Sequence, residues 1–476
     1  METCQVWLTE GWESMKREIG LSGWTFALRG SSDPRFSPGW FGCAHHRSGA
    51  CPEHSRRDPG GAIFHLLSLY IHIPFCRARC TYCDFNTYAG LEALHADYVR
   101  ALVREIRLVG DTLRGIELNA ETIYLGGGTP TVLSLEHLGA ILAACHESFE
   151  MAADVEITSE ANPGTLDKGY LAGLRGLGIN RLSLGVQSFD DGLLRLLGRI
   201  HTGAQAVETY RLAREAGFEN VNLDLIYGLP AQTLSQWRGT LERALDLRPD
   251  HLSLYALTLE EGTPLHGQVA RGELPQPDPD LAADMVLLAQ EMLGAAGYRH
   301  YEISNWARPG CECRHNLTYW RNEPYLGFGA GAHSWFMGRR YHNVLSPQEY
   351  IQRLSDGASP VAAGVQRSSP AGGLGVSPNS FLSPAVAELE EINEALEMAE
   401  TMILGLRLVE EGVSFKAFAR RFGRRVESLY ERELRELKEL GLIEIMADRV
   451  RLTERGWLLG NEVFQRFLPA SSEERG

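Results

Sequence analysis

The chain has 476 residues, of which 44% are hydrophobic and 22% are charged. This composition is typical of a globular protein and excludes the fibrous, low-complexity and wholly disordered classes, while the length allows two or three domains. The formal net charge of −15 argues against a nucleic acid partner, because binding to a polyanion requires Lys and Arg to neutralise phosphates.

No secretory or membrane-spanning segment is predicted. The longest apolar run, near Phe64 to Phe75, is too short to span a bilayer and contains two histidines. The N-terminus lacks the basic start, apolar stretch and small-residue cleavage site of a secretory signal. We therefore expect a cytoplasmic, reducing setting, in which clustered cysteines are metal ligands rather than a disulfide framework.

Residues 1–66 show neither the alternation of a strand nor the repeat of an amphipathic helix. They mix Trp, His, Cys, Pro and Gly. We expect a disordered extension, or a start codon assigned too far upstream, rather than a folded domain.

Residues 67–300 alternate short β-rich runs with longer amphipathic segments, which is typical of βα units. The predicted strands are 67–75, 121–127, 155–161, 181–189, 220–228 and 251–258. The predicted helices between them include 93–109, 134–149, 206–218 and 235–247. Six units in sequence predict an α/β fold with a parallel sheet, doubly wound or curled into a full or partial barrel, with ligands at the C-terminal ends of the strands.

The remainder of the chain no longer alternates strands and helices in βα units. Residues 301–355 are rich in aromatics and glycine and are predicted to extend the core, and residues 356–384 consist mainly of Gly, Ser, Pro, Ala and Val, as in a flexible insertion. Residues 385–470 predict a terminal domain with a helix over 388–408, followed by the helix, helix, hairpin order of a winged helix. Nothing in its sequence assigns it to DNA.

The stretch CRARCTYCDF places Cys76, Cys80 and Cys83 on a loop directly after the first predicted strand. Three thiolates suit a 4Fe-4S cluster with one open iron, at which a small molecule can chelate. Zinc would require a fourth Cys or His nearby and more commonly uses paired cysteines two residues apart. Zinc and plain structural cysteines stay open as alternatives.

YIHIPFCRARCTYCDF resembles the cluster loop of the radical S-adenosylmethionine superfamily, in its coproporphyrinogen-oxidase-like branch. Further matching blocks follow in family order: GGGTPT at 126–131, EITSEANPGT at 156–165, RLSLGVQSFD at 181–190, LGRIHT at 197–202 and NLDLIYGLPAQT at 222–233. The resemblance covers about residues 67–465. It implies a partial (β/α)6-type barrel, and a cluster that passes an electron from a flavodoxin- or ferredoxin-like donor to S-adenosylmethionine, generating a 5'-deoxyadenosyl radical.

The same resemblance implies two sets of cofactor-binding residues. Tyr70, Gly127 and Glu160 match positions that hold the chelated S-adenosylmethionine. The positions of a second S-adenosylmethionine are matched by Tyr82, Gly128, Thr129, Gln187, Arg199 and Asp224.

Physical arguments agree with several of these roles. Glycines 126–128 let a backbone approach a ligand closely and offer amide donors to a carboxylate. Glu160, at a strand end, is placed to accept from an ammonium group; the alternative is an ordinary surface carboxylate. Asp224 interrupts an apolar strand and needs a partner, either a ribose or Arg199. Gln187 and Arg199 could instead serve as internal hydrogen-bond and ion-pair partners.

Two features point to one part of this branch. Phe85 stands where the oxidase carries a fourth cysteine, and HNLTYW at 315–320 resembles the haem chaperones called HemW. That resemblance implies haem as cargo and haem-accepting proteins as partners, and leaves transient contact with membrane proteins open. His315, or Cys313, would be the haem ligand beside flat aromatic surfaces. A hydrogen-bonded structural histidine and oxygen-independent coproporphyrinogen III oxidase activity are the alternatives.

Overall fold

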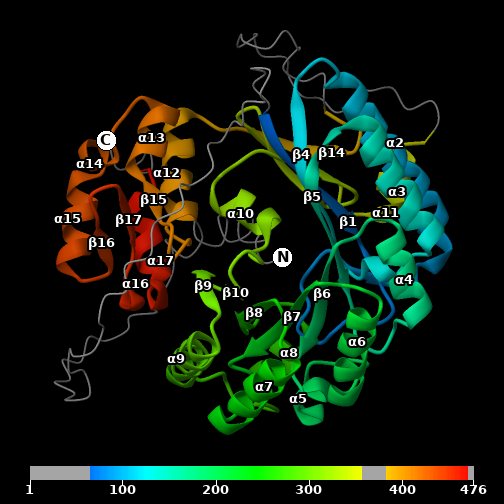
Figure 1. The fold of residues 1–476 in the computed structure, drawn as a ribbon, viewed down its shortest axis with the longest axis horizontal. Helices are drawn as coiled ribbons and strands as arrows, with labels where there is room; N and C mark the ends of the chain where they lie inside the picture. The colour runs from blue at the N-terminus through cyan, green and yellow to red at the C-terminus, as the bar shows by residue number, and fades with distance from the viewer. Residues whose placement is uncertain (1–64, 356–381, 470–476) are drawn as a thin grey trace.

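The computed structural model describes residues 65–355 and 382–469. Most of the expected N-terminal extension over 1–66 and of the expected insertion over 356–384 therefore lies outside the described residues. Within them, a large open sheet carries helices on its outer face, and a smaller C-terminal unit stands beside it (Figure 1).

Six parallel strands form the centre of the large sheet and are neighbours in chain order. They are β1 (His65–Ile73), β4 (Leu118–Gly127), β5 (Glu150–Ala161), β6 (Arg181–Gln187), β7 (Asn220–Tyr227) and β8 (His251–Ala256). The full sheet has twelve strands and is open, with β14 at one end and β9 at the other. The predicted partial barrel and its six strands are thus confirmed.

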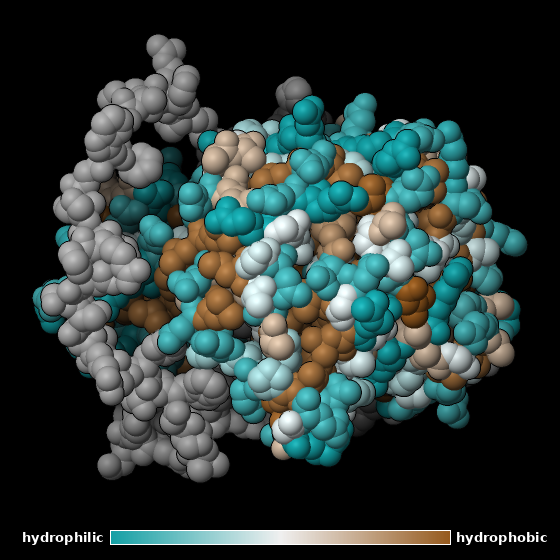
Figure 2. Space-filling view, turned by 90° about the horizontal axis from the view of Figure 1, so that it is seen from below, coloured by the Kyte–Doolittle hydropathy of each residue, from teal (hydrophilic) through white to brown (hydrophobic). Residues whose placement is uncertain are grey.

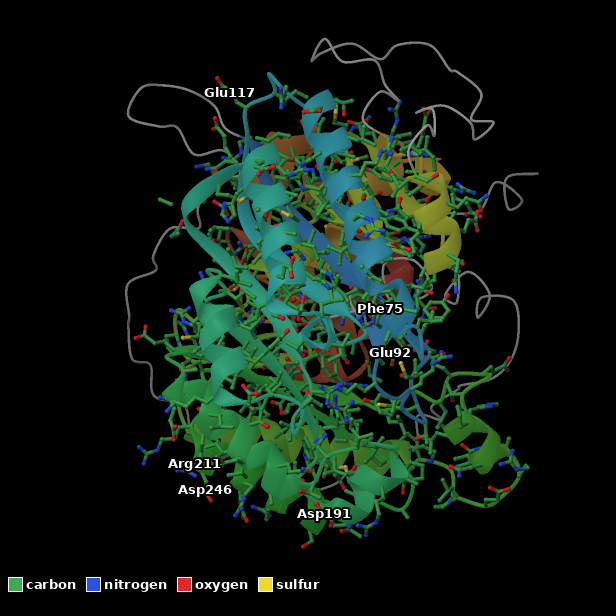
Figure 3. All side chains as sticks on the ribbon, turned by 90° about the vertical axis from the view of Figure 1, so that its right-hand side faces the viewer. Phe75, Glu92, Glu117, Asp191, Arg211 and Asp246 are labelled. Atoms are coloured by element: carbon green, nitrogen blue, oxygen red, sulfur yellow. The ribbon has the colours of Figure 1, made fainter. Side chains whose placement is uncertain are left out.

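The helices that follow these strands cover the outer face of the sheet (Figure 1). They are α2 (His95–Thr112), α3 (Leu135–Ser148), α4 (Lys168–Gly176), α6 (Gly203–Glu215) and α7 (Leu234–Leu247), with α5 (Asp191–Leu196), α8 (Pro264–Ala270) and α9 (Pro279–Ala295) in addition. Helices α6 and α7 begin with capping boxes, in which Thr202 and Thr233 pair with a glutamine three residues on. Arg211 and Asp246 point outward from these helices (Figure 3).

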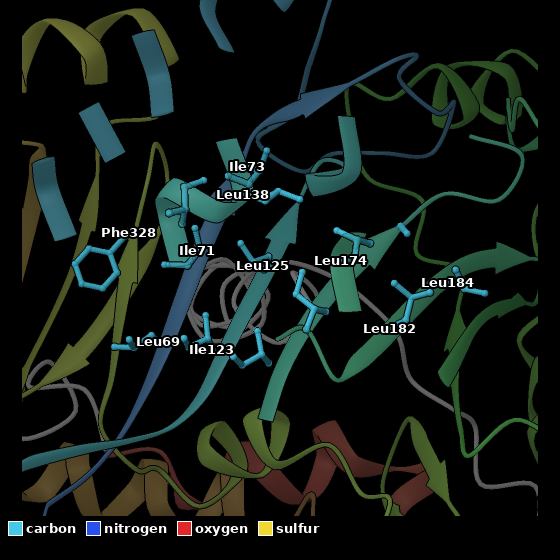
Figure 4. Close-up of a cluster of buried hydrophobic side chains, with 14 of the residues drawn as sticks. Leu69, Ile71, Ile73, Ile123, Leu125, Leu138, Leu174, Leu182, Leu184 and Phe328 are labelled. Atoms are coloured by element: carbon cyan, nitrogen blue, oxygen red, sulfur yellow. The ribbon is translucent and has the colours of Figure 1, made fainter. Parts of the chain in front are cut away.

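The central strands alternate apolar and polar side chains, and this alternation separates two faces of the sheet. Leu69, Ile71 and Ile73 on β1 pack with residues of the neighbouring strands and outer helices in one buried cluster (Figure 4). The residues between them, such as Tyr70 and His72, face the concave side, since successive side chains of a strand point in opposite directions. The concave face is therefore lined with polar side chains and suits a polar ligand.

The sheet continues beyond the six strands at both edges. Next to β8 lie β10 (Asn305–Ala307) and β9 (Arg299–Glu302), and next to β1 lie β11 (Tyr325–Phe328), β12 (His333–Phe336), β13 (Arg339–Asn343) and β14 (Val386–Glu391). Helix α10 (Arg314–Trp320) connects the two edges and contacts both β4 and the C-terminal unit (Figure 1). Helix α11 (Pro347–Arg353) packs on α2.

One predicted element is wrong in part. A helix was expected over 388–408, but residues 386–391 form strand β14 and the helix α12 runs over Glu394–Gly405. Three glutamates of β14 stand opposite basic side chains of β13, in the pairs Arg339–Glu391 at 3.6 Å, Arg340–Glu390 at 3.6 Å and His342–Glu388 at 3.5 Å. The backbone pairing of β14 with β13 and the packing of Val386 and Leu389 on the core favour the strand over the intrinsic helix preference of the glutamates, and the charge pairs add a smaller contribution. The large sheet therefore extends past residue 385.

The C-terminal unit has its own apolar core, which includes Met402, Phe418 and Val450. After α12 it contains β15 (Val413–Ser414), α13 (Phe415–Phe422), α14 (Val426–Leu429), α15 (Glu431–Glu439), β16 (Ile443–Ile445), β17 (Arg449–Leu452), α16 (Glu454–Leu458) and α17 (Gly460–Phe464). Its three strands pair in the order β15-β17-β16. The predicted helical, winged-helix-like terminal domain is confirmed.

The surface is mixed in character. Figure 2 shows hydrophilic residues over much of one face, with hydrophobic residues gathered between them in patches. Two exposed apolar side chains, Ile200 and Leu345, belong to loops that border the cysteine loop. Among the described residues, no helix has the length and apolar character needed to cross a bilayer.

Candidate cofactor site

A cavity of about 210 Å³ opens at the C-terminal ends of the central strands. Ten of the thirteen predicted site residues line it: Cys76, Cys80, Tyr82, Cys83, Gly127, Gly128, Glu160, Gln187, Arg199 and Asp224. The other three, Tyr70, Thr129 and His315, lie outside this lining. The cavity therefore lies where the parallel sheet predicts a ligand, and it is lined by the residues that the sequence motifs predict.

The cysteine loop is held at both ends. It starts at β2 (Phe75–Cys76) and ends at β3 (Tyr88–Ala89), and these two short strands pair with each other. Phe75, marked in Figure 3, packs against His95 and Tyr98 with ring centroids 4.4 and 5.1 Å apart. In the middle of the loop, the Thr81 amide donates to the Leu197 carbonyl at 3.1 Å. The thiols are thus presented on a fixed loop.

A hydrogen-bond donor lies within reach of each thiol. Thr129 Oγ1 is 3.6 Å from Cys76 Sγ, Arg199 Nη1 is 3.3 Å from Cys80 Sγ, and Thr87 Oγ1 is 3.5 Å from Cys83 Sγ. Across 65–355 and 382–469, no three His, Cys, Asp or Glu side chains form a group suited to a single metal ion. A four-iron cluster instead takes each thiolate on a different iron.

The glycines after β4 are required by close packing. Gly127 has φ of +110°, and a Cβ there would lie 2.8 Å from the His72 ring. A Cβ on Gly128 would lie 2.6 Å from the Phe75 carbonyl oxygen and 3.0 Å from Cys76 Sγ. Their amides, expected to bind a carboxylate, already donate to Glu160 Oε2 at 3.2 Å and to the Ile73 carbonyl at 2.8 Å. The glycines thus contribute space beside the cysteine loop.

Glu160 lines the cavity and is held by two donors. The Tyr124 hydroxyl donates to Oε1 at 2.8 Å and the Gly127 amide donates to Oε2 at 3.2 Å. Burial, reinforced by the negative charge of Asp224, raises the pKa of the Glu160 carboxyl to about 6. The carboxylate is therefore oriented, and it is charged at neutral pH, as a receptor for an ammonium group requires.

Asp224 has partners that the sequence did not reveal. Ser183 donates to Oδ2 at 3.0 Å and Asn222 donates to Oδ1 at 2.8 Å. The expected partner Arg199 instead donates to Asn162 Oδ1 at 2.5 Å and to the Gly185 carbonyl at 2.6 Å. Asn222 and Ser183 were detectable as polar residues alternating with apolar ones in their strands.

Gln187 and Tyr82 also line the cavity, and each has an unusual local environment. Gln187 has φ of +64°, which is uncommon for a residue other than glycine, and the β6–β7 register shifts beside it. Its buried Oε1 has no hydrogen-bond partner among the described residues. Burial raises the pKa of the Tyr82 hydroxyl, against the opposing charge of Arg199. A strained backbone and an unpaired buried oxygen at a cavity are typical of a ligand contact.

His315 is fully buried below this cavity. Its Nδ1 lies 2.6 Å from Thr122 Oγ1 and its Nε2 lies 2.9 Å from the Tyr319 hydroxyl. Burial, followed by the charge of Arg181, lowers the pKa of the imidazole to about 3. The structure therefore shows a neutral histidine whose two ring nitrogens are both engaged.

The residues around His315 are buried as well. Cys313 is the N-cap residue of α10, and burial raises the pKa of its thiol to about 12. Trp320 packs with Tyr319 and Tyr325 in a buried apolar cluster. Tyr70 donates to or accepts from His72 Nδ1 at 3.1 Å, within the wall behind Gly127. The HNLTYW helix thus closes the concave side of the sheet from below the cavity.

The central strands of the open sheet are parallel, and three cysteines lie on the loop after the first of them. Packed glycines stand at the end of the second strand and an oriented carboxylate at the end of the third. Together these features define a radical S-adenosylmethionine protein. The model of the Radical SAM superfamily matches residues 70–244, and that of the HemN C-terminal domain matches residues 393–459. Membership of this superfamily implies a 4Fe-4S cluster and S-adenosylmethionine.

Relatives of known name narrow the assignment. The heme chaperone HemW of Bacillus subtilis is 38% identical over 404 residues, covering 85% of this chain and 99% of that protein. Heme chaperone HemW of Escherichia coli is 36% identical, covering 84% and 98%. The solved structure of coproporphyrinogen III oxidase HemN from Escherichia coli superposes with a TM-score of 0.68 at 24% identity, over 84% of this chain and 89% of that one. The chain belongs to the HemW family.

Proposed function

We propose that this protein is a haem chaperone with a radical S-adenosylmethionine core, which binds haem and passes it to acceptor proteins. The observation that carries the proposal is the match to relatives named heme chaperone over nearly their whole length. The cavity adds a second argument, because Phe85 lines it at the position where the resemblance to the oxidase would place a fourth cysteine. An apolar ring there cannot ligate iron.

Within this function, Cys76, Cys80 and Cys83 are proposed to hold the 4Fe-4S cluster. The donor set fits the group, since a polar hydrogen lies near each sulfur and the adjacent Gly128 leaves room for no side chain. When bound, the cluster supplies an electron to S-adenosylmethionine, received from a flavodoxin- or ferredoxin-like donor. Glu160 would hold the ammonium group, with Gly127 and Tyr70 in the surrounding wall.

A second S-adenosylmethionine is proposed on the opposite wall of the cavity. Gln187 offers its unpaired oxygen, Arg199 a buried Nε without a partner in the described residues, and Asp224 a carboxylate already oriented by Ser183. Tyr82, Gly128 and Thr129 lie at its border with the cysteine loop. Ribose hydroxyls suit a fixed carboxylate of this kind.

The cavity is assigned here to the cluster and S-adenosylmethionine, and His315 lies outside its lining. Coordination by His315 would also require both of its ring hydrogen bonds to break and α10 to move. We therefore propose that haem contacts the surface of the protein and that His315 holds α10 against β4 through its two hydrogen bonds.

His315→Ala tests this assignment. It is expected to lower the free energy of unfolding by about 1–3 kcal/mol, because the buried hydroxyls of Thr122 and Tyr319 lose their partner. The Soret absorption of added haem is expected to stay unchanged. His146→Ala, at an exposed position of α3, is the matched control and should alter neither quantity. Loss of the Soret band at unchanged stability would instead identify His315 as the haem ligand.

The affinity for S-adenosylmethionine is expected to depend on pH through Glu160. Because the pKa of its carboxyl is raised to about 6, the carboxylate that attracts the ammonium is lost as the pH falls through 6, and binding at pH 5 is expected to be roughly tenfold weaker than the plateau above pH 7. Equilibrium binding to the cluster-loaded protein measures this. Glu160→Gln should bind weakly with a flat profile, whereas a wild-type profile without a step near pH 6 would contradict the role of Glu160.

The raised pKa of Glu160 also determines how this residue makes folding stability depend on pH. A carboxyl with a pKa higher in the folded than in the unfolded chain binds its proton more tightly when folded. Its contribution to stability is therefore fully present below the unfolded value near 4.5 and is lost as the pH rises through about 6. Glu160 thus favours ligand binding at neutral pH at some expense of folding stability.

A paired assay tests the function as a whole. The chain is reconstituted with iron and sulfide without air, and one portion is titrated with haem and mixed with a haem-free acceptor. A second portion receives coproporphyrinogen III, S-adenosylmethionine and a reductant. Stoichiometric haem uptake and transfer without carbon dioxide release is expected, and the reverse pattern would identify an oxidase.

A further inference from the structure

Asn162 connects two of the three thiol environments of the cysteine loop. It follows the end of β5, and its side chain lies beside the cavity. Its Nδ2 donates to Thr129 Oγ1 at 2.8 Å, and its Oδ1 accepts from Arg199 Nη2 at 2.5 Å. One amide therefore contacts both the donor beside Cys76 and the donor beside Cys80.

The direction of each hydrogen bond follows from the chemistry of the groups. The Thr129 hydroxyl accepts from Asn162, so its own proton is available to Cys76 Sγ, 3.6 Å away. The guanidinium of Arg199 is fixed by Nη2, which also donates to the Gly185 carbonyl at 2.6 Å, and this leaves Nη1 directed at Cys80 Sγ at 3.3 Å. Both thiol contacts thus depend on the same asparagine.

The local structure fixes Asn162 itself. Pro163 restricts the backbone of Asn162, the residue before it, and Thr165 Oγ1 donates to the Asn162 carbonyl at 2.7 Å. Gly185 gives the amide its space, since a Cβ there would lie 3.2 Å from Asn162 Oδ1 and 3.3 Å from Arg199 Nη2. The side chain therefore stands in a confined position in which it cannot rotate freely.

Hydrogen bonds to the sulfurs of an iron-sulfur cluster stabilise its more negative, reduced state and so raise its reduction potential. Residues that orient such donors affect this potential indirectly. We propose that Asn162 is a positioning residue that raises the reduction potential of the cluster by directing Thr129 to Cys76 and Arg199 to Cys80. This inference rests on the proposed function only in requiring a cluster on the three cysteines. The step concerned is the uptake of one electron from a low-potential, flavodoxin-like reductant.

The test is a redox titration of the reconstituted full chain, without S-adenosylmethionine, followed by electron paramagnetic resonance of the reduced cluster. Asn162→Ala and Thr129→Val are each expected to give about tenfold less reduced cluster at a fixed potential, which is about 59 mV for a one-electron couple. In the double variant, Thr129→Val should add little to Asn162→Ala, because the hydroxyl has already lost its orientation.

Two control variants separate this role from a merely structural one. Thr129→Ser keeps the hydroxyl and should titrate close to wild type. Asn180→Ala removes an asparagine whose side chain likewise bridges two groups, here the Ile157 amide at 2.9 Å and the Val155 carbonyl at 2.8 Å on β5. These groups lie away from the thiols, so the variant should leave the reduction potential unchanged. Should Asn162→Ala take up less iron than wild type, the pair of Thr129 variants still decides the direction of the shift.

The outcomes are distinguishable. A wild-type chain that takes up no iron would contradict the proposed function. A wild-type chain with its full iron content, but with Asn162→Ala and Thr129→Val titrating at the wild-type potential, would contradict this inference alone. Fully additive shifts in the double variant would also overturn it, since they would show that Asn162 does not act through Thr129.

Discussion

Cys80→Ser is expected to abolish cluster assembly. After anaerobic reconstitution, the wild-type chain should hold about four irons, and the variant close to none, because two thiolates cannot retain a cluster that already has one open iron. Cys80 lies on the loop between β2 and β3, is partly exposed and belongs to no buried apolar cluster. The variant should therefore fold normally and lack the broad visible absorption of the wild type.

The chain offers a matched control for this prediction. Cys311 is a free cysteine of comparable partial exposure outside the cavity lining, so that Cys311→Ser should keep the full iron content. Iron and sulfide analysis with an absorption spectrum measures both variants. A Cys80→Ser protein with undiminished iron would show that the cysteine loop is not the metal site.

Glu400→Ala is expected to cause a large loss of stability at the junction of the large sheet and the C-terminal unit. Glu400 on α12 and Arg340 on β13 have side chains only 5% and 9% exposed, and Arg340 Nη2 lies 2.8 Å from Glu400 Oε1. Burial raises the pKa of the Glu400 carboxyl, and the charge of Arg340 opposes that shift. Removing the carboxylate leaves a buried guanidinium without its main counter-charge, at a cost of about 3–5 kcal/mol.

A second partner of the same arginine provides the control. Glu390 lies 3.6 Å from Arg340 Nη1, but its side chain is 47% exposed, so that Glu390→Ala should cost less than about 1 kcal/mol. Urea unfolding followed by tryptophan fluorescence compares the two variants, because Trp335 is buried on the neighbouring strand β12. Equal losses in both variants would show that burial does not decide the contribution of this pair.

The six central strands could be predicted from the sequence because their signal is local. In β1, for example, Leu69, Ile71 and Ile73 alternate with Ser68, Tyr70 and His72, and each strand is followed by a longer amphipathic segment. The same order places the ends of β1, β4 and β5 at one edge of the sheet. For that reason ten of the predicted site residues line one cavity.

Elements that depend on partners distant in the sequence escaped prediction. Residues 386–391 form a strand because their backbone pairs with β13 and because Val386 and Leu389 pack on the core, and nothing within the segment itself indicates those partners. Asn162 was visible only as part of a family motif, since its partners Thr129 and Arg199 lie in segments that follow β4 and α5 and are distant in the sequence. Contacts of this kind are set by the tertiary structure alone.

His315 has contacts that its motif does not reveal. An imidazole followed by Tyr319 and Trp320 suggested a flat apolar platform for a porphyrin. In the structure Tyr319 is a hydrogen-bond partner of the ring, and Trp320 packs into the apolar cluster between the sheet and α12. The motif marks the family, and in the structure its histidine links α10 to β4 through hydrogen bonds with Tyr319 and Thr122.

The most direct test of the central claim is haem transfer from the reconstituted chain. Protein loaded with its cluster is given one equivalent of haem, separated from free haem and mixed with a haem-free acceptor, while a parallel sample receives coproporphyrinogen III, S-adenosylmethionine and a reductant. The account predicts that haem appears on the acceptor and that the parallel sample releases no carbon dioxide. Carbon dioxide and protoporphyrinogen IX from the parallel sample, with no haem retained or transferred, would contradict it.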